Sequence, residues 1–212
     1  MLDATIRRII DPLLDRLGRR AAALGVRADA VTILGLALGL ACAGAIAAGL
    51  DLLALLLLAL NRFCDGLDGA LARATARTDR GGFLDIVFDF AFYGAVPAAF
   101  ALRDPDANAL PAAILLFAFY VNGASFLAFA AMAAKRGLES QVHGLKSIYF
   151  TAGLAEGTET ILAFAVMIAW PQAFPVLAYL FAGLTLMSAL ARVSLAWRVL
   201  ADPDDENPPD GG

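Results

Sequence analysis

LLALLLLALNRFCDGLDGALARATARTDRGGFLDIVFDFAFYGAVPAAFAL, residues 52–102, contains two long apolar segments that are interrupted by aspartates at regular intervals. The apolar segments cover residues 52–72 and 83–102, and the connection between them is polar and basic. Each segment has about the 20 residues that an α-helix needs to cross the core of a bilayer. The stretch therefore predicts two neighbouring membrane helices joined by a short loop.

Four further apolar segments continue this pattern on both sides, at residues 31–50, 109–134, 147–170 and 173–197. Over the whole chain 60% of the residues are hydrophobic, and the mean hydropathy is +0.73. A soluble domain is nearer half apolar. The sequence therefore predicts an all-α integral membrane bundle of six transmembrane helices within residues 31–200.

The two ends of the chain differ from this bundle in composition. Residues 1–30 carry six arginines among apolar positions, a pattern typical of an amphipathic helix that lies on an anionic leaflet. They lack the short apolar core and the small-residue cleavage site of a signal peptide. Residues 201–212 are acidic and rich in Pro, Asp and Gly, which predicts a disordered tail.

Basic residues indicate how the bundle is oriented. The loops 73–82 and 135–146 are both basic, as is the N-terminal arm, whereas the opposite side of the bundle has only Arg103. Positive charge is retained on the cytoplasmic side of a membrane protein. We therefore expect a multi-pass protein of the inner (cytoplasmic) membrane with both ends of the chain and these loops in the cytoplasm.

Four aspartates, Asp65, Asp68, Asp85 and Asp89, lie in or beside the two central helices. A carboxylate within a membrane is costly and usually serves a function. Spacings of three and four place each pair on one helix face, and both pairs lie towards the cytoplasmic side, so we expect them to converge. Clustered carboxylates require cations, and hard divalent ions prefer oxygen ligands. Two such ions can clamp a pyrophosphate during an in-line displacement.

Residues around this cluster fit the same chemistry. Gly66 and Gly69 flank Asp68 and would allow a bulky ligand to approach the backbone. Arg73 follows one turn later and can pair with phosphate oxygens. In the alternative interpretation the aspartates only cap helices and pair with nearby arginines, which does not account for their regular spacing.

Residues 65–89 resemble the signature of the CDP-alcohol phosphotransferase (phosphatidyltransferase) family: Asp, two residues, Asp-Gly, two residues, Ala-Arg, seven or eight residues, Gly, three residues, Asp, three residues, Asp. The matching positions are Asp65, Asp68, Gly69, Ala72, Arg73, Gly81, Asp85 and Asp89. The six predicted helices resemble the family topology as well. One departure is Arg27-Ala28-Asp29 before Thr32, where members often have Pro-Asn; Asp29 is expected to cap the helix.

The resemblance implies a membrane enzyme of phospholipid biosynthesis that moves a phosphoryl group, in its phosphatidyl form, from a CDP-linked donor such as CDP-diacylglycerol to an alcohol, releasing CMP. It implies that the four aspartates hold two divalent ions, Mg²⁺ or Mn²⁺, and that Asp89 is the base that deprotonates the acceptor. It places the donor against Gly66, Gly69, Ala72, Arg73 and Gly81. It also implies a homodimer, and no nucleic-acid partner is expected.

The acceptor, a small alcohol or an alcohol phosphate, is not identified by the sequence. Intramembrane Glu156 and Glu159 are candidates for its pocket, and Lys135 and Arg192 are candidates for binding its phosphate. The alternatives are ion pairing between these residues and ordinary membrane anchoring. The stretch Glu-Gly-Thr-Glu-Thr at 156–160 resembles an uncharacterised bacterial branch of the family, which does not name the acceptor.

Small residues recur every four positions at Gly35, Gly39 and Ala43, and this pattern allows close helix packing, either within the chain or in a dimer. Two other functions also employ intramembrane aspartates. A polyprenyl-diphosphate-using membrane transferase has aspartate motifs that lack the Gly and Ala-Arg spacing. A cation transporter commonly binds its ion at the bilayer midplane, whereas these aspartates lie near one face.

Overall fold

The computed structural model describes residues 2–137 and 157–201, with side chains from Ile10 onward. Its helices are α1 (Leu2–Ala23), α2 (Ala28–Ala47), α3 (Asp51–Ala74), α4 (Asp79–Arg103), α5 (Pro105–Lys135), α7 (Gly157–Ala169), the 3₁₀ helix η1 (Pro171–Ala173) and α8 (Phe174–Val199). No strand occurs within these two ranges. The predicted all-α class is therefore confirmed, whereas the predicted tail lies almost wholly outside the described residues.

Four helical stretches are long and apolar enough to cross a membrane: α2, α4, α5 and residues 171–199. The two other predicted crossings do not meet these criteria. Helix α3 carries several charged residues, and α7 is described over only 13 residues, because the first half of the predicted segment 147–170 lies outside the described ranges. The predicted membrane protein is thus supported, with four candidate spans in the part of the chain that the structure describes.

Helices α4 and α5 begin four residues before their predicted apolar segments. The Thr78 hydroxyl caps α4 by accepting a hydrogen bond of 3.1 Å from the Gly81 N–H. The Asp104 carboxylate caps α5 by accepting one of 3.1 Å from the Ala107 N–H, with Pro105 in the first turn. Capping oxygens satisfy backbone donors that have no partner within the helix. The polar first turns therefore extend both helices beyond their apolar segments.

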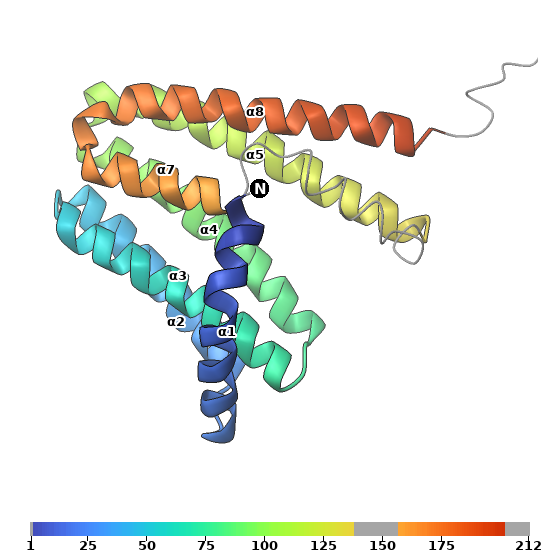
Figure 1. The fold of residues 1–212 in the computed structure, drawn as a ribbon. Coiled ribbons are helices and arrows are strands. Elements are labelled where there is room, and N and C mark those ends of the chain that lie inside the picture. The colour runs from blue at the N-terminus through green and yellow to red at the C-terminus, as the bar shows by residue number, and fades with distance from the viewer. Residues whose placement is uncertain (1, 138–156, 202–212) are drawn as a thin grey trace, which may run out of the picture.

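Helices α2 and α3 form an antiparallel hairpin in which α2 packs against α4, and α5 in turn packs between α4 and α8 (Figure 1). The core between these helices is largely aromatic. The rings of Phe100 and Phe174 stack with their centroids 4.2 Å apart, and Phe92 meets Phe164 edge to face at 6.0 Å. These contacts join α4 to α7 and α8, so α4, which carries two of the aspartates, is held on several sides.

The small-residue face of α2 is buried within the chain. A Cβ atom on Gly39 would lie 2.8 Å from the Phe92 ring, and one on Gly35 would lie 3.3 Å from Cys64. Ala43 is buried as well. This face therefore serves intramolecular packing, as one of the two predicted alternatives has it. The other alternative, a dimer interface on this face, is wrong because α3 and α4 already cover it.

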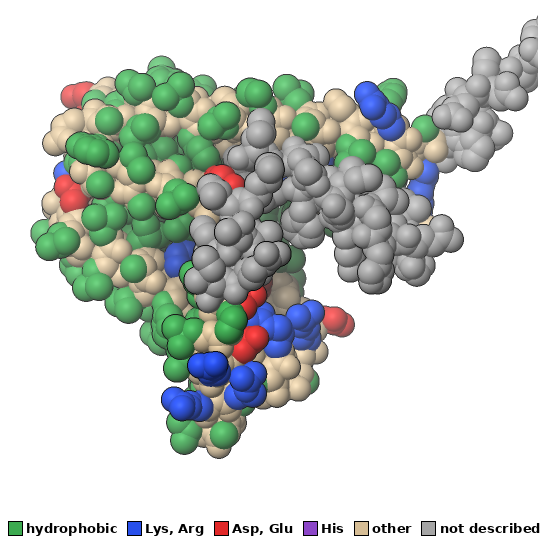
Figure 2. Space-filling view, viewed as in Figure 1, with side chains coloured by type: hydrophobic (Ala, Val, Ile, Leu, Met, Phe, Trp, Pro, Cys, Tyr) green, Lys and Arg blue, Asp and Glu red, His purple; other side chains and the backbone are tan. Residues whose placement is uncertain are grey.

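Helix α1 crosses α3 on the side that carries the signature residues (Figure 1). Gly18 lies so close to Ala70 that a Cβ atom on it would come within 2.8 Å of the Ala70 backbone. The exposed side of α1 carries Arg16, Arg19 and Arg20. Figure 2 shows basic side chains gathered at this end of the molecule, where the chain has arginines and no lysine. The arm is therefore a helix with a basic exposed side.

Candidate active site

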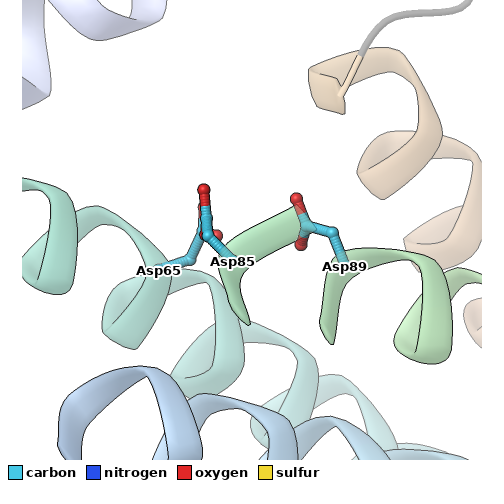
Figure 3. A group of neighbouring side chains, drawn as sticks. All are labelled: Asp65, Asp85 and Asp89. Carbon is cyan, nitrogen blue, oxygen red and sulfur yellow. The ribbon is translucent and has the colours of Figure 1, made fainter. Parts of the chain in front are cut away.

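Helices α3 and α4 bring three aspartates together. Asp65 comes from α3, and Asp85 and Asp89 come from successive turns of α4. Each offers a carboxylate oxygen, and these oxygens all lie within 4.8 Å of one another. Figure 3 shows the three side chains directed towards the same space. Helix α4 follows α3 after residues 75–78, and the Thr78 cap begins it about two turns before Asp85.

Asp68 lines the same small pocket but is not a member of this close group. It is buried at 8% relative exposure, and Thr32 of α2, which lines the same pocket, donates its hydroxyl hydrogen bond of 3.1 Å to the Ala28 carbonyl. The pocket is lined by Thr32, Gly35, Leu36, Asn61, Arg62, Asp65, Asp68, Asp85, Phe88 and Asp89. All four predicted aspartates therefore face one pocket, three of them as a compact carboxylate group.

Arg62 lines the pocket as well and is one of the nearby arginines with which the aspartates could pair in the alternative interpretation. Its guanidinium lies 3.3 Å from the Asp89 Oδ1 atom and 3.6 Å from the Asp65 Oδ2 atom. Its position three residues before Asp65, hence on the same face of α3, is the signal that could have identified it. Arg62 joins the two helices at the level of the carboxylate group.

Two of the residues expected to face the donor are in contact with α1. The Arg73 guanidinium donates hydrogen bonds of 2.8 Å and 3.2 Å to the Asp15 carboxylate. A Cβ atom on Gly66 would lie 2.6 Å from the Leu14 side chain, so a larger residue at this position would displace Leu14. Gly69 has more room, because the nearest atom to its hypothetical Cβ is an Arg73 nitrogen at 3.4 Å.

Gly81 lies in the first turn of α4, where its N–H bonds to Thr78. A Cβ atom on it would also lie 3.7 Å from an Asp29 oxygen. Asp29 forms an ion pair with Arg80 and lies 4.0 Å from Arg27. The cap position of α2 is Arg27, without a side-chain cap. The expectation that Asp29 caps this helix is therefore wrong, and its carboxylate pairs with arginine instead.

Ala72 is half-buried on α3, one residue before Arg73. It lies in the last turn of α3, and like Gly69 it follows Asp65 along the helix.

The residues predicted for the acceptor are not gathered in the aspartate pocket. Lys135 is exposed in the last turn of α5, and Glu159 is in the first turn of α7. Arg192 on α8 donates hydrogen bonds of 2.8 Å to the Asn122 side chain and 2.9 Å to the Ser125 hydroxyl. Glu156 lies outside the described residues. Of the three described residues, none lines the pocket.

The chain is similar to several known proteins. The sequence matches the CDP-alcohol phosphatidyltransferase family over residues 25–200. It is 46% identical to the inner membrane protein YnjF of Escherichia coli over 193 residues, 91% of this chain and 94% of that protein. It is 39% identical to the archaetidylinositol phosphate synthase of Pyrococcus horikoshii over 85 residues, 40% of this chain and 45% of that protein.

The fold is similar to the crystal structure of Mycobacterium tuberculosis phosphatidylinositol phosphate synthase (PgsA1) with CDP-DAG bound. The TM-score is 0.67 and the sequence identity is 22%, over 88% of this chain and 94% of that chain. At this identity the likeness is one of fold.

Proposed function

The chain belongs to the CDP-alcohol phosphatidyltransferase family, and we propose that it transfers the phosphatidyl group of CDP-diacylglycerol to a small alcohol and releases CMP. As a member of the family it is a membrane transferase of phospholipid biosynthesis that employs a CDP-linked donor. This membership decides against the polyprenyl-transferase and cation-transporter alternatives. The observation that carries the proposal is the group formed by Asp65, Asp85 and Asp89 in the pocket between α2, α3 and α4.

The proposed donor is a CDP-linked lipid because the carboxylate group lies on apolar helices. Helix α4 is itself a candidate membrane span, so a donor that is anchored by acyl chains can present its pyrophosphate there directly. The solved relative of the same fold holds CDP-DAG, which supports this choice. In the proposal the donor also contacts Gly66, Gly69, Ala72, Arg73 and Gly81, and Arg73 would exchange Asp15 for a phosphate.

The carboxylate group fits a divalent cation. Three carboxylate oxygens within 4.8 Å of one another form the kind of donor set that Mg²⁺ prefers, since it often binds through a few carboxylates plus substrate phosphates. We propose that Asp65, Asp85 and Asp89, with Asp68 beside them, hold Mg²⁺ or Mn²⁺, as two ions in the working enzyme. When bound, such ions neutralise charge on the pyrophosphate and on the departing CMP.

In the proposed mechanism the side chains divide the remaining work. The acceptor oxygen forms a bond to the phosphorus that carries the diacylglycerol, the bond from that phosphorus to the CMP oxygen breaks, and the acceptor proton passes to the Asp89 carboxylate. Asp89 Oδ1 accepts a hydrogen bond from Arg62, which fixes the orientation of the carboxylate. Its second oxygen is then the proposed proton acceptor, because a base must lie within hydrogen-bond reach of the proton it removes.

For the acceptor we propose an alcohol phosphate, with Arg192, Lys135, Glu156 and Glu159 contributing to its pocket. The support is the positive charge of the two basic residues, one of which is held in place between α8 and α5 by Asn122 and Ser125. Both synthases among the similar proteins carry inositol phosphate in the names of their products.

A purified-enzyme assay tests the proposed function. We expect CMP release from CDP-diacylglycerol only when a matching alcohol is added, and expect phosphorylated alcohols, inositol phosphate among them, to support it better than their unphosphorylated forms. The lipid product should carry the added alcohol in mass spectrometry. CMP release that is independent of every alcohol, or lack of CMP release from any CDP-linked lipid, would contradict the proposal.

We also propose six membrane crossings within the 31–200 catalytic domain, counting α3 and the segment that includes α7, with α1 on the cytoplasmic surface. The support is the basic end of the molecule in Figure 2, formed by α1 and the α3–α4 connection, and the similarity to an inner membrane protein.

This topology predicts that a reporter that works only in the cytoplasm is active when it is fused to either end of the chain, and that a reporter that works only in the periplasm is inactive there. A fusion after Gly49, in the α2–α3 turn, should be active only as a periplasmic reporter, since that turn lies at the opposite end of α2. Opposite locations for the two ends of the chain would exclude an even number of crossings.

A homodimer remains part of the proposal on the family resemblance alone. Its interface cannot be formed by Gly35, Gly39 and Ala43, which are covered within the chain. We therefore expect a dimer to employ a different helix face.

A further inference from the structure

Arg62 is held by contacts from its own helix α3 and from α4, and through Asn61 it is linked to α2. Its Nε atom donates a hydrogen bond of 2.8 Å to the Asn61 side-chain oxygen, and the Asn61 amide in turn donates one of 2.7 Å to the Gly35 carbonyl on α2. The Arg62 guanidinium carbon lies 5.2 Å from the centre of the Phe92 ring on α4, a geometry in which the ring attracts the cation.

This guanidinium faces two of the three grouped carboxylates with two different nitrogens. Nη2 lies 3.3 Å from Asp89 Oδ1, and Nη1 lies 3.6 Å from Asp65 Oδ2. The planar fork of arginine suits such a bridge, which the single ammonium of lysine cannot reproduce. Each pair of atoms leaves the second oxygen of the carboxylate outside the Arg62 contact.

Other arginines near the pocket have partners elsewhere. Arg73 pairs with Asp15, and Arg80 pairs with Asp29. Arg62 is therefore the cation whose described ion pairs join two members of the carboxylate group. Like charges at this separation repel one another, so positive charge beside the group stabilises it even before a divalent ion binds.

We propose that Arg62 is a positioning residue: a built-in counter-ion that keeps Asp65 and Asp89 gathered and oriented until a divalent cation binds beside them. This inference rests on the proposed metal site and assigns a role to a residue outside the aspartate signature. It implies that wild-type protein without metal is already organised at the site. It also implies that loss of the Arg62 charge destabilises the metal-free protein more than the metal-bound protein.

Thermal unfolding of the full chain in detergent separates these states. Wild-type, Arg62→Gln and Arg62→Lys proteins would be stripped with EDTA and measured without and with saturating Mg²⁺, with NaCl at matched ionic strength as the blank. We expect the Mg²⁺-induced rise in Tm to be larger for Arg62→Gln than for wild type by about 4 °C or more. Arg62→Lys keeps the charge but not the bridge, so its rise should be intermediate.

Arg103→Gln is a matched control, because Arg103 pairs with Asp51 at the opposite end of α3. Its side-chain exposures of 24% and 33% for arginine and aspartate are close to the 21% and 34% of Arg62 and Asp89. Arg103→Gln should lower the Tm equally with and without Mg²⁺. If Arg62→Gln cannot be isolated, the comparison of Arg62→Lys with wild type decides the question.

Equal Mg²⁺-induced rises in wild type and both Arg62 variants would overturn the role of Arg62 and leave the metal site standing. No rise in any protein, with Mg²⁺ or Mn²⁺, would overturn the metal site itself and the inference with it. A larger rise in the Arg62 variants than in wild type, together with an unchanged rise in Arg103→Gln, is the result that the proposal requires.

Discussion

Replacing Asp89 by asparagine should lower turnover by roughly 10²–10⁴-fold, the usual contribution of a general base, while CDP-diacylglycerol binding in the presence of metal is retained. Asparagine keeps the shape of the side chain and one oxygen, which can still accept the hydrogen bond from Arg62, but it cannot take the acceptor proton. The measurement is kcat together with donor affinity determined separately from rate, because a loss of rate alone does not distinguish binding from chemistry.

Asp85→Asn is the comparison within the same helix. Asp85 belongs to the same carboxylate group one turn earlier on α4, but it has no proposed role as a base. Its replacement should weaken metal and donor binding together. Asp51→Asn, at the far end of α3, should change neither quantity at the site. Near-normal turnover of Asp89→Asn at saturating metal would show that another group takes the proton.

The sequence predicted the position of the site well because its geometry is local. Helices α3 and α4, which carry the aspartates, are consecutive and joined by residues 75–78, and helical spacing places Asp85 and Asp89 on one face. The same reasoning located the helices approximately. It missed the first turns of α4 and α5, since the polar capping residues Thr78 and Asp104 continue a helix where an apolar pattern has already ended.

Contacts between elements distant in sequence could not be predicted in this way. Gly66 fits the approach of a ligand on sequence grounds, whereas the structure places Leu14 of α1 against it. The bridge from Arg62 to Asp89 depends on how α3 and α4 are rotated about their axes, which sequence spacing within one helix does not give. The small-residue face of Gly35 and Gly39 could pack either within the chain or against a second copy. Only the tertiary structure shows that Asn61, Cys64 and Phe92 occupy it.

Removal of divalent cations should abolish activity. The reaction concentrates negative charge from the pyrophosphate and the departing CMP beside Asp65, Asp85 and Asp89, whose oxygens already lie within 4.8 Å of one another. Charge stabilisation by a bound metal contributes several kcal/mol, and each 1.36 kcal/mol corresponds to a factor of ten in rate. We therefore expect turnover in excess EDTA to fall by at least about 10³-fold, and Mg²⁺ or Mn²⁺ to restore it.

The restoration step identifies the ligands. Asp85→Asn should require a higher Mg²⁺ concentration for half-maximal activity than wild type, because it removes one carboxylate from the close group. Asp68→Asn should raise this concentration less, because Asp68 lines the pocket but is not one of the three grouped carboxylates. Asp51→Asn should reach half-maximal activity at the same Mg²⁺ concentration as wild type, since Asp51 pairs with Arg103 at the other end of α3. Full turnover of wild-type enzyme in excess EDTA would exclude a metal-dependent reaction at this site, and equal Mg²⁺ requirements in all three variants would exclude these aspartates as its ligands.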